Sequence, residues 1–228
     1  MDCKNGIEWG TVAQWAGAFA TSCAVLVALF KDSVKSWLNK PELQLEALPL
    51  IDNCFLSNVS DGNNNFEKRY YIRVRIINNG TRTAKNVKVF VAGCEKENAS
   101  GKFIRRPDFQ PMKLVWTHTG KNECSTIEPE IWNHCELGQI LLPGSINKLA
   151  NESVKHIPNT ETSFILDTEV KPFTGSSFFE KGKYKFTLEV VSDDTKKKSY
   201  KLVLNHVGLW FDDATKMYNE GFGITIES

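Results

Sequence analysis

The fold of this chain is decided by residues 70–93, which read YYIRVRIINNGTRTAKNVKVFVAG. Apolar and polar side chains alternate through its first part, which predicts a β-strand with one buried side. The apolar positions are Ile72, Val74 and Ile76, and the positions that face the other way are Tyr71, Arg73 and Arg75. The segment NNGTRTAKN predicts a turn, because Gly80 tolerates positive φ, and VKVFVAG from Val87 predicts the return strand.

Further strands are predicted on both sides of this unit. They are LQLEALPLI from Leu43, MKLVWT from Met112, SFILDTEV from Ser163, KYKFTLEVV from Lys183 and SYKLVLNHV from Ser199. The last two flank the polar turn SDDTKKK and are expected to form a hairpin. Many short strands separated by Gly-, Asn- and Asp-rich turns predict a mainly β fold, a β-sandwich. Long loops are expected at residues 52–68, 94–108, 120–140 and 171–181.

The C-terminal region predicts a short helix and a last strand. The segment DDATKMYNE is typical of a helix that Asp212 or Asp213 caps, with Met217 turned inward. FGITIES, which closes the chain, predicts an edge strand. We interpret Trp210, in GLWFDD, as a core residue that closes the sandwich rather than as a platform for a ligand.

An uncharged apolar run lies near the N-terminus, between Val12 and Phe30. A helix of about 20 apolar residues spans the hydrocarbon core of a bilayer. A cleaved signal peptide fits less well, because the leader MDCKNGIEWG has one lysine against two acidic residues and VALFKD is a poor cleavage site. A buried core helix stays open, since the run is rich in alanine. We expect a membrane anchor in residues 1–40, with about 12–30 in the bilayer, followed by a domain at 42–228.

Flanking charges predict the orientation of this anchor. Lys31, Lys35 and Lys40 follow the run, whereas Lys4 alone precedes it. Lysine and arginine concentrate on the cytoplasmic side, so the N-terminus is expected outside and the C-terminal domain in the cytosol. Trp9 and Trp37 bracket the run in the manner of membrane-interface anchors.

Small residues recur at every fourth position of the run. They are Ala16, Ala20, Ala24 and Ala28, with Gly17 beside them. This spacing lets two membrane helices approach closely, and it raises the hypothesis of a homo-oligomer formed through the anchor. The alternative is that alanine is simply common in weakly hydrophobic anchors.

Composition excludes several function classes. The chain has 228 residues and a formal net charge of +1, which argues against a large nucleic-acid-binding face. Its 6 cysteines include no CxxC pair, so no metal or cofactor is expected. Cys124, His134 and Cys135 are interpreted as two loop thiols and a solvated imidazole. A Cys124–Cys135 disulfide is expected only if the domain lies outside the cytosol.

The sequence contains no recognisable catalytic motif. We find no GxSxG, no HExxH and no phosphate-binding glycine loop, and the four histidines are widely separated. The acidic pairs Glu128/Glu130 and Asp212/Asp213 are interpreted as solvated loops rather than cation sites. Arg105 and Arg106 are expected to be exposed in a loop. We therefore expect that the protein is not an enzyme.

The strand–turn–strand YIRVRIINNGTRTAKNVKVFV resembles that of bacterial immunoglobulin-like domains. FQPMKLVWTH, ILLPGSINKLAN and GKYKFTLEVVSDDTKKKSYKLVLNHVGLWFDDATKM extend this likeness. With the apolar run, the chain resembles prokaryotic single-pass membrane proteins that carry a cytosolic immunoglobulin-like β-sandwich. The resemblance implies fold and topology and offers no catalytic residues. Such proteins often lie among mobile or phage-defence genes.

Two functions follow as expectations. The first is a membrane-tethered, non-enzymatic adaptor that presents its β-sandwich to a cytosolic protein partner through loops or an edge strand. The alternative is a sensor or effector of membrane integrity in a phage-defence-type system, acting through association of anchor helices.

Overall fold

The structure is a computed structural model that describes residues 9–48, 51–60, 66–145, 158, 160–170 and 177–227. Side chains are not described for residues 9–11, 32–38 and 51. The chain divides into two compact units, Met1–Lys40 and Pro41–Ser228. The first unit contains one apolar helix and the second is mainly β.

Helix α1 runs from Trp9 to Leu38 and ends ahead of Pro41, whose ring cannot continue a helix. Its segment Val12–Lys31 is long and apolar enough to cross a membrane, and none of it is buried against the chain. Two polar side chains in this segment bond to their own helix. The Thr21 hydroxyl donates to the Gly17 carbonyl at 2.8 Å, and the Ser22 hydroxyl donates to the Ala18 carbonyl at 2.9 Å. From Val12 to Phe30 the helix therefore presents an almost entirely apolar surface.

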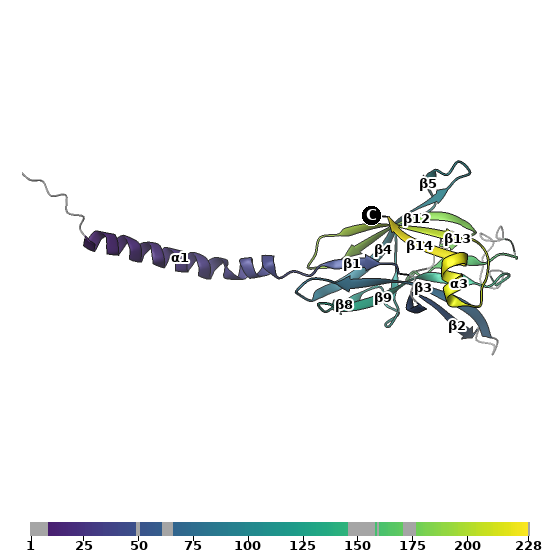
Figure 1. The fold of residues 1–228 in the computed structure, drawn as a ribbon, viewed down its shortest axis with the longest axis horizontal. Helices are drawn as coiled ribbons and strands as arrows, with labels where there is room; N and C mark the ends of the chain where they lie inside the picture. The colour runs from purple at the N-terminus through teal and green to yellow at the C-terminus, as the bar shows by residue number, and fades with distance from the viewer. Residues whose placement is uncertain are drawn as a thin grey trace, which may run out of the picture. The chain divides into compact units, whose positions relative to one another are not determined.

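The second unit consists of two antiparallel sheets (Figure 1). In the first sheet the strands follow the order β1-β3-β9-β10-β11, with β2 also paired to β3 and β7 to β9. Their bounds are β1 Leu43–Glu46, β2 Cys54–Ser60, β3 Phe66–Asn78, β7 Val115–Trp116, β9 Trp132–Leu141, β10 Ser163–Leu166 and β11 Phe178–Phe179. A one-turn helix, η1, spans Ile51–Asn53 ahead of β2.

The second sheet follows the order β14-β13-β12-β4-β5, with β6 and β8 also paired to β4. Its strands are β4 Ala84–Glu97, β5 Phe103–Arg105, β6 Met112–Lys113, β8 Cys124–Ile127, β12 Gly182–Val191, β13 Lys198–His206 and β14 Phe222–Glu227. The predicted hairpin is confirmed: β12 and β13 pair from Gly182–His206 to Val190–Lys198. The predicted edge strand is also confirmed, as β14.

The longest strands of the two sheets, β3 and β4, are consecutive in the sequence. Along β3, Ile72, Val74 and Ile76 are fully buried, as the alternation predicts. Strand β4 does not pair with β3, however. It pairs with β12 in the other sheet, so the expected strand–turn–strand is a crossover between layers. The crossover buries the apolar sides of both strands in the one core between the sheets, which a hairpin in one sheet would not do.

The buried Asn78 side chain holds this crossover in place. Its amide nitrogen donates to the carbonyls of Arg82 and Ile127, at 2.7 and 2.9 Å. Its amide oxygen accepts from the backbone N–H groups of Glu42 and Gly80, at 3.0 and 3.1 Å. One asparagine thus makes hydrogen bonds to backbone groups from three segments.

Several expected loops are in fact strands. Residues 120–140 contain β8 and most of β9, and residues 52–68 contain β2. Strand β5 lies within 94–108, and β11 lies within 171–181, of which residues 171–176 are outside the described part. The sequence pattern did not reveal β9 as a strand. Both of its sides are buried, including the polar His134 and Glu136, so its apolar and polar residues do not alternate. Strand β2 carries short polar residues that resemble a loop.

The segment MKLVWT also differs from its prediction as a single strand. It splits into β6, which pairs with β4, and β7, which pairs with β9 in the other sheet. Buried Leu114 lies at the switch, and its N–H donates to the Val89 carbonyl at 2.9 Å.

Aromatic rings fill the space between the sheets. Phe164 of the first sheet lies 4.9 Å, centre to centre, from Phe222 of the second. Phe179 of the first sheet likewise packs edge-on against Phe186 of the second, at 5.2 Å. Both sheets thus share one hydrophobic core. The contacts tie β14 and β11, at the ends of the two strand orders, into that core.

The C-terminal helix agrees with its prediction. Helix α3, Ala214–Lys216, continues into the helical turn η3, Met217–Gly221. The Asp213 carboxylate caps it by accepting from the Lys216 N–H at 2.7 Å, and Met217 is fully buried. Trp210 packs on the core ring of Tyr70 at 4.9 Å, in line with a role in closing the domain.

Gly138 offers a sharp test of the packing between β9 and β10. A methyl group added there would lie 2.2 Å from the Ile165 carbonyl oxygen and 2.5 Å from the Phe164 ring. We expect Gly138→Ala to lower the free energy of unfolding by about 2 kcal/mol or more, because backbone blocks the space. Urea denaturation followed by tryptophan fluorescence measures this. Gly93→Ala is the matched control, since its nearest contact is an ordinary 3.7 Å to Thr187. Equal stability of the two variants would contradict the packing described.

Candidate functional site

The residues predicted to associate anchor helices are exposed on α1. They are Ala16, Ala20, Ala24, Ala28 and Gly17. A methyl group added at Gly17 would meet no other atom. These positions are therefore free to contact a second helix or lipid.

Of the predicted membrane-interface residues, Lys31 is exposed at the end of the apolar segment. The side chains of Trp9, Lys35 and Trp37 lie outside the described part of the structure. Their interfacial role stays a prediction.

The outward side of β3 carries arginines that lie on exposed aromatic rings. The Arg73 guanidinium is 5.4 Å from the centre of the Phe55 ring, and that of Arg75 is 4.9 Å from the Trp132 ring. Phe55 is 47% exposed and Trp132 is 38% exposed, so both rings are accessible to a partner. We call these four side chains the arginine–aromatic surface. The sequence predicted the outward direction of both arginines but not the rings, because Phe55 and Trp132 lie in segments expected to be loops.

Two carboxylates hold the arginines of this surface. Arg73 Nε donates to Glu136 Oε1 at 3.0 Å, and Arg75 Nη2 donates to Glu46 Oε2 at 2.5 Å. Because each guanidinium is paired with a carboxylate and lies over an aromatic ring, its position is restrained and its charge is balanced locally. Glu136 is almost completely buried, and this burial raises its pKa although Arg73 acts in the opposite direction.

The interpretation of His134 as a solvated imidazole is wrong. His134 is buried in β9, and its Nε2 lies 3.0 Å from the Asn53 amide oxygen. Burial lowers its pKa to about 4, and the charges of Arg73 and Arg75 act in the same direction. The ring is therefore neutral at pH 7, and it supports the Trp132 ring at 4.7 Å.

Cys135 is not a loop thiol either. It lies fully buried in β9, and burial raises its pKa well above the usual value. Cys124, in β8, is half-buried, and both cysteines are free thiols. A buried, protonated thiol is a poor nucleophile and a poor metal ligand.

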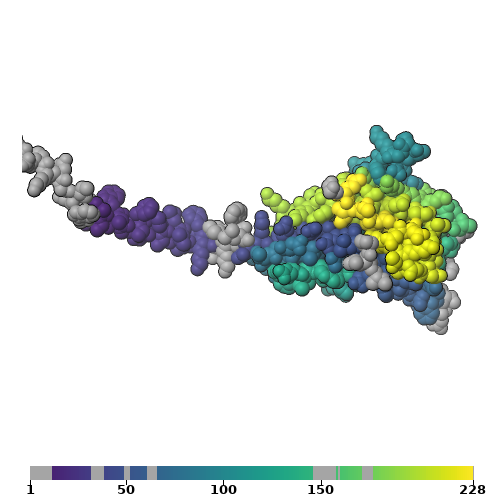
Figure 2. All heavy atoms as spheres, viewed as in Figure 1, coloured from purple at the N-terminus to yellow at the C-terminus, as the bar shows by residue number. Residues whose placement is uncertain are grey.

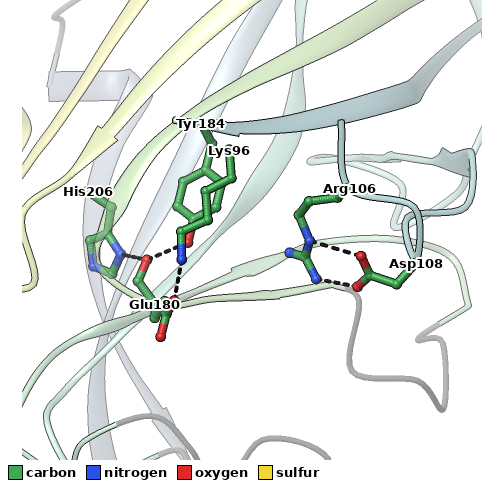
Figure 3. A network of polar contacts seen from close by, with 6 residues as sticks. All are labelled: Lys96, Arg106, Asp108, Glu180, Tyr184 and His206. Carbon is green, nitrogen blue, oxygen red and sulfur yellow. Dashed lines mark hydrogen bonds and ion pairs between the residues drawn. The ribbon is translucent and has the colours of Figure 1, made fainter. Parts of the chain in front are cut away.

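A second polar cluster joins β4, β12 and β13 (Figure 3). The Glu180 carbonyl accepts from the Tyr184 hydroxyl and from His206 Nδ1, both at 3.1 Å. The Glu180 carboxylate forms an ion pair with Lys96. Because Nδ1 of His206 donates, its Nε2 accepts from the Thr162 hydroxyl, at 2.8 Å. Burial lowers the pKa of His206 to about 4. Nδ1 thus holds the β11–β12 connection, and Nε2 holds Thr162 just ahead of β10.

Arg105 and Arg106 were expected to be alike, but they differ. Arg105 is exposed in β5. Arg106 donates two hydrogen bonds to the Asp108 carboxylate, with Nη2–Oδ2 at 2.5 Å (Figure 3). Its guanidinium also lies 5.1 Å from the centre of the Phe179 ring. It is a packing residue rather than a free cation.

Glu128 and both members of the Asp212/Asp213 pair are engaged within the protein. Glu128 accepts from the Thr83 hydroxyl at 2.5 Å. Asp212 forms an ion pair with Lys68 at 2.9 Å, while Asp213 caps α3. Among the described residues, no group of three or more His, Cys, Asp or Glu side chains is placed to hold a metal ion.

Comparison of the chain with models of protein families, with curated proteins and with solved structures finds no match.

The buried histidines predict a pH dependence of stability. His206 has a pKa near 4 when folded and about 6.5 when unfolded. The unfolded state therefore binds more protons between these values, and stability falls as pH drops from 6.5 to 4. We expect His206 to account for about 3 kcal/mol of that loss.

Urea denaturation of the wild type, His206→Gln and His118→Gln across this pH range measures the effect. His206→Gln should be less stable at pH 7 and show a flatter profile. His118 is exposed, so His118→Gln should keep the wild-type slope. A His206→Gln profile parallel to that of the wild type would contradict this account.

Proposed function

We propose that this protein is a single-pass, membrane-tethered binding module without enzymatic activity. Residues 12–30 of α1 lie in the bilayer, and the two-sheet domain at 42–228 is an immunoglobulin-like sandwich in the cytosol. The domain presents the arginine–aromatic surface to a protein partner. The observation that carries this proposal is the pairing of half-exposed Phe55 and Trp132 with two arginines that are already neutralised.

The membrane tether is supported by the exposed apolar surface of α1. Between Val12 and Phe30 the helix carries no charge, and its large side chains include Trp15 and Phe19, both more than 70% exposed. In water such a surface is unfavourable, whereas in a bilayer the same side chains contact lipid. The lysines that follow the segment favour a cytosolic C-terminal domain.

The composition of the arginine–aromatic surface supports a protein partner. Tryptophan, tyrosine and arginine dominate the binding energy of protein interfaces, because they bury large areas at small entropic cost. Here both arginines are fixed by Glu46 and Glu136 before any partner binds. Since the charge of both arginines is balanced, the surface offers planar apolar area rather than a positive electrostatic field that would attract phosphate groups. It therefore suits a protein better than a nucleic acid.

Free thiols support the cytosolic location. Cys54, Cys94 and Cys135 are buried and unbridged, and burial raises the pKa of all three thiols. Such cores are typical of reducing compartments.

A photo-crosslinking amino acid tests the surface in cells. Placed at Phe55, it should form a discrete adduct, and Trp132→Ala should weaken partner binding roughly 30-fold, as expected for loss of an interface anchor. Ser199, exposed on the second sheet, is the control position. Adducts of equal yield and size from positions 55 and 199 would refute the surface. Paired cytosolic and periplasmic reporters at the C-terminus test the topology, and periplasmic activity alone would refute the cytosolic placement.

The exposed small residues of α1 favour a second candidate function. Ala16, Ala20, Ala24 and Ala28 leave room for close approach of another helix, and association of anchors would then report or perturb the state of the membrane, as in a phage-defence-type system.

Ala20→Leu with Ala24→Leu should reduce anchor association several-fold in a membrane two-hybrid assay, because bulk at the contact separates the helices. Val25→Leu and Val27→Leu, which leave the stripe intact, are the control. An unchanged signal from the alanine variants would exclude this mechanism.

A further inference from the structure

Strand β14 leaves one edge of the second sheet open. It pairs with β13 on one side, and no described strand pairs with its other side. The register shows which backbone groups point outward. Val207 N–H donates to the Gly221 carbonyl at 3.0 Å, and the same register continues to Lys201–Glu227 without a shift. Hydrogen-bonded pairs alternate in an antiparallel ladder, so Gly223, Thr225 and Glu227 bond to β13. The N–H and C=O groups of Ile224 and Ile226 therefore point away from the sheet.

Within the described residues, β14 lacks several of the devices that usually prevent strand pairing. Edge strands are commonly protected by lysine, proline, a bulge or very short length. Strand β14 is 6 residues long, has no proline or lysine, and pairs with β13 without a bulge. Its one charged residue, Glu227, lies at the end and is neutralised by Lys185 at 2.8 Å. Figure 2 shows the C-terminal residues, in yellow, on the surface of the domain.

Two other edges are less open. On β1, the outward carbonyl of Leu43 already accepts from the Tyr200 hydroxyl at 3.2 Å. Strand β5 is only 3 residues long and is followed by Pro107, which has no N–H to donate.

The sequence of β14 is complementary to itself in one antiparallel register. If Ile224 of one copy pairs with Ile226 of a second, each of the two such pairs exchanges two hydrogen bonds. The outward N–H and C=O groups of Ile224 and Ile226 are then satisfied in both copies. On the core side, isoleucine then lies opposite isoleucine. On the solvent side, Thr225 lies opposite Thr225, a favourable cross-strand pair, and Glu227 lies opposite Gly223, so no like charges meet.

We infer that the domain binds a second copy of itself by antiparallel pairing of β14 with β14 around Thr225, which joins the two second sheets into one continuous sheet. This contact is separate from the arginine–aromatic surface, which lies on the other sheet, and from the alanine positions of α1. It makes the protein a dimer through its folded domain, whatever the anchors do. Each dimer then presents two arginine–aromatic surfaces to its partner.

Disulfide trapping of the full chain in membranes tests the inferred register. In this register the two Thr225 Cα atoms are a non-hydrogen-bonded pair, about 4.5 Å apart. This separation lies within the range of about 4.4–6.8 Å that a disulfide spans. Thr225→Cys should therefore give roughly tenfold more disulfide-linked dimer under mild oxidation than the unmodified chain, since the pairing raises the local thiol concentration. The unmodified chain measures the background from its own cysteines.

Asn205→Cys is the matched control. Asn205 is exposed on the same side of the sheet, on β13 beside Gly223, so both β14 strands lie between it and its counterpart and it cannot reach it. It should give no more dimer than the unmodified chain. The experiment is repeated with Ala20→Leu and Ala24→Leu, which removes any contribution from anchor association.

A charge variant supplies a second measurement. Thr225→Lys places two lysines opposite each other and should shift the full chain in detergent from dimer to monomer by light scattering, while Asn205→Lys should not. Equal trapping at positions 225 and 205, or an unchanged dimer in Thr225→Lys, would overturn the inference. Loss of the dimer when only Ala20→Leu and Ala24→Leu are introduced would overturn it too. Loss of the photo-crosslink at Phe55 leaves these readouts untouched, so the two proposals fail separately.

Discussion

The structure of the folded domain depends on the burial of β3 and β4 against each other from opposite sheets. Each is the longest strand of its sheet, and the chain passes directly from one to the other. Their apolar sides cannot be buried within a single sheet, so the connection must change layers. Asn78 makes this possible, because it supplies the hydrogen bonds that the crossing backbone loses.

This layered core also determines what the outer side of the first sheet can do. With the apolar positions of β3 turned inward, Arg73 and Arg75 must face outward on the same strand. Their neighbours in space come from β1, β2 and β9, which supply Glu46, Phe55, Glu136 and Trp132. The result is a surface of planar side chains that hold one another in place. Their loss of side-chain entropy occurs during folding rather than on binding.

The buried histidines of the domain make structural hydrogen bonds. His134 and His206 are held neutral by burial and have hydrogen-bond partners, and Cys135 is buried and protonated. The exposed groups that a partner can contact include the planar side chains of the arginine–aromatic surface on the first sheet and the unpaired backbone groups of β14 at the edge of the second. Both suit contact with proteins, which agrees with the proposed binding function.

The sequence by itself determined the apolar helix, the mainly β class, the β12–β13 hairpin, the Asp213 cap and the direction of Arg73 and Arg75. These features follow from local periodicity and local hydrogen bonding, which a single segment carries within itself. Only the tertiary structure decided that β3 and β4 lie in different sheets, that β9 is a central strand, and that Phe55 and Trp132 meet the arginines. These depend on which distant segment lies alongside, and a strand buried on both sides, such as β9, shows no alternation that would reveal it. The partner of β14 is undecided at the sequence level for the same reason, since backbone groups direct pairing there and every residue carries them.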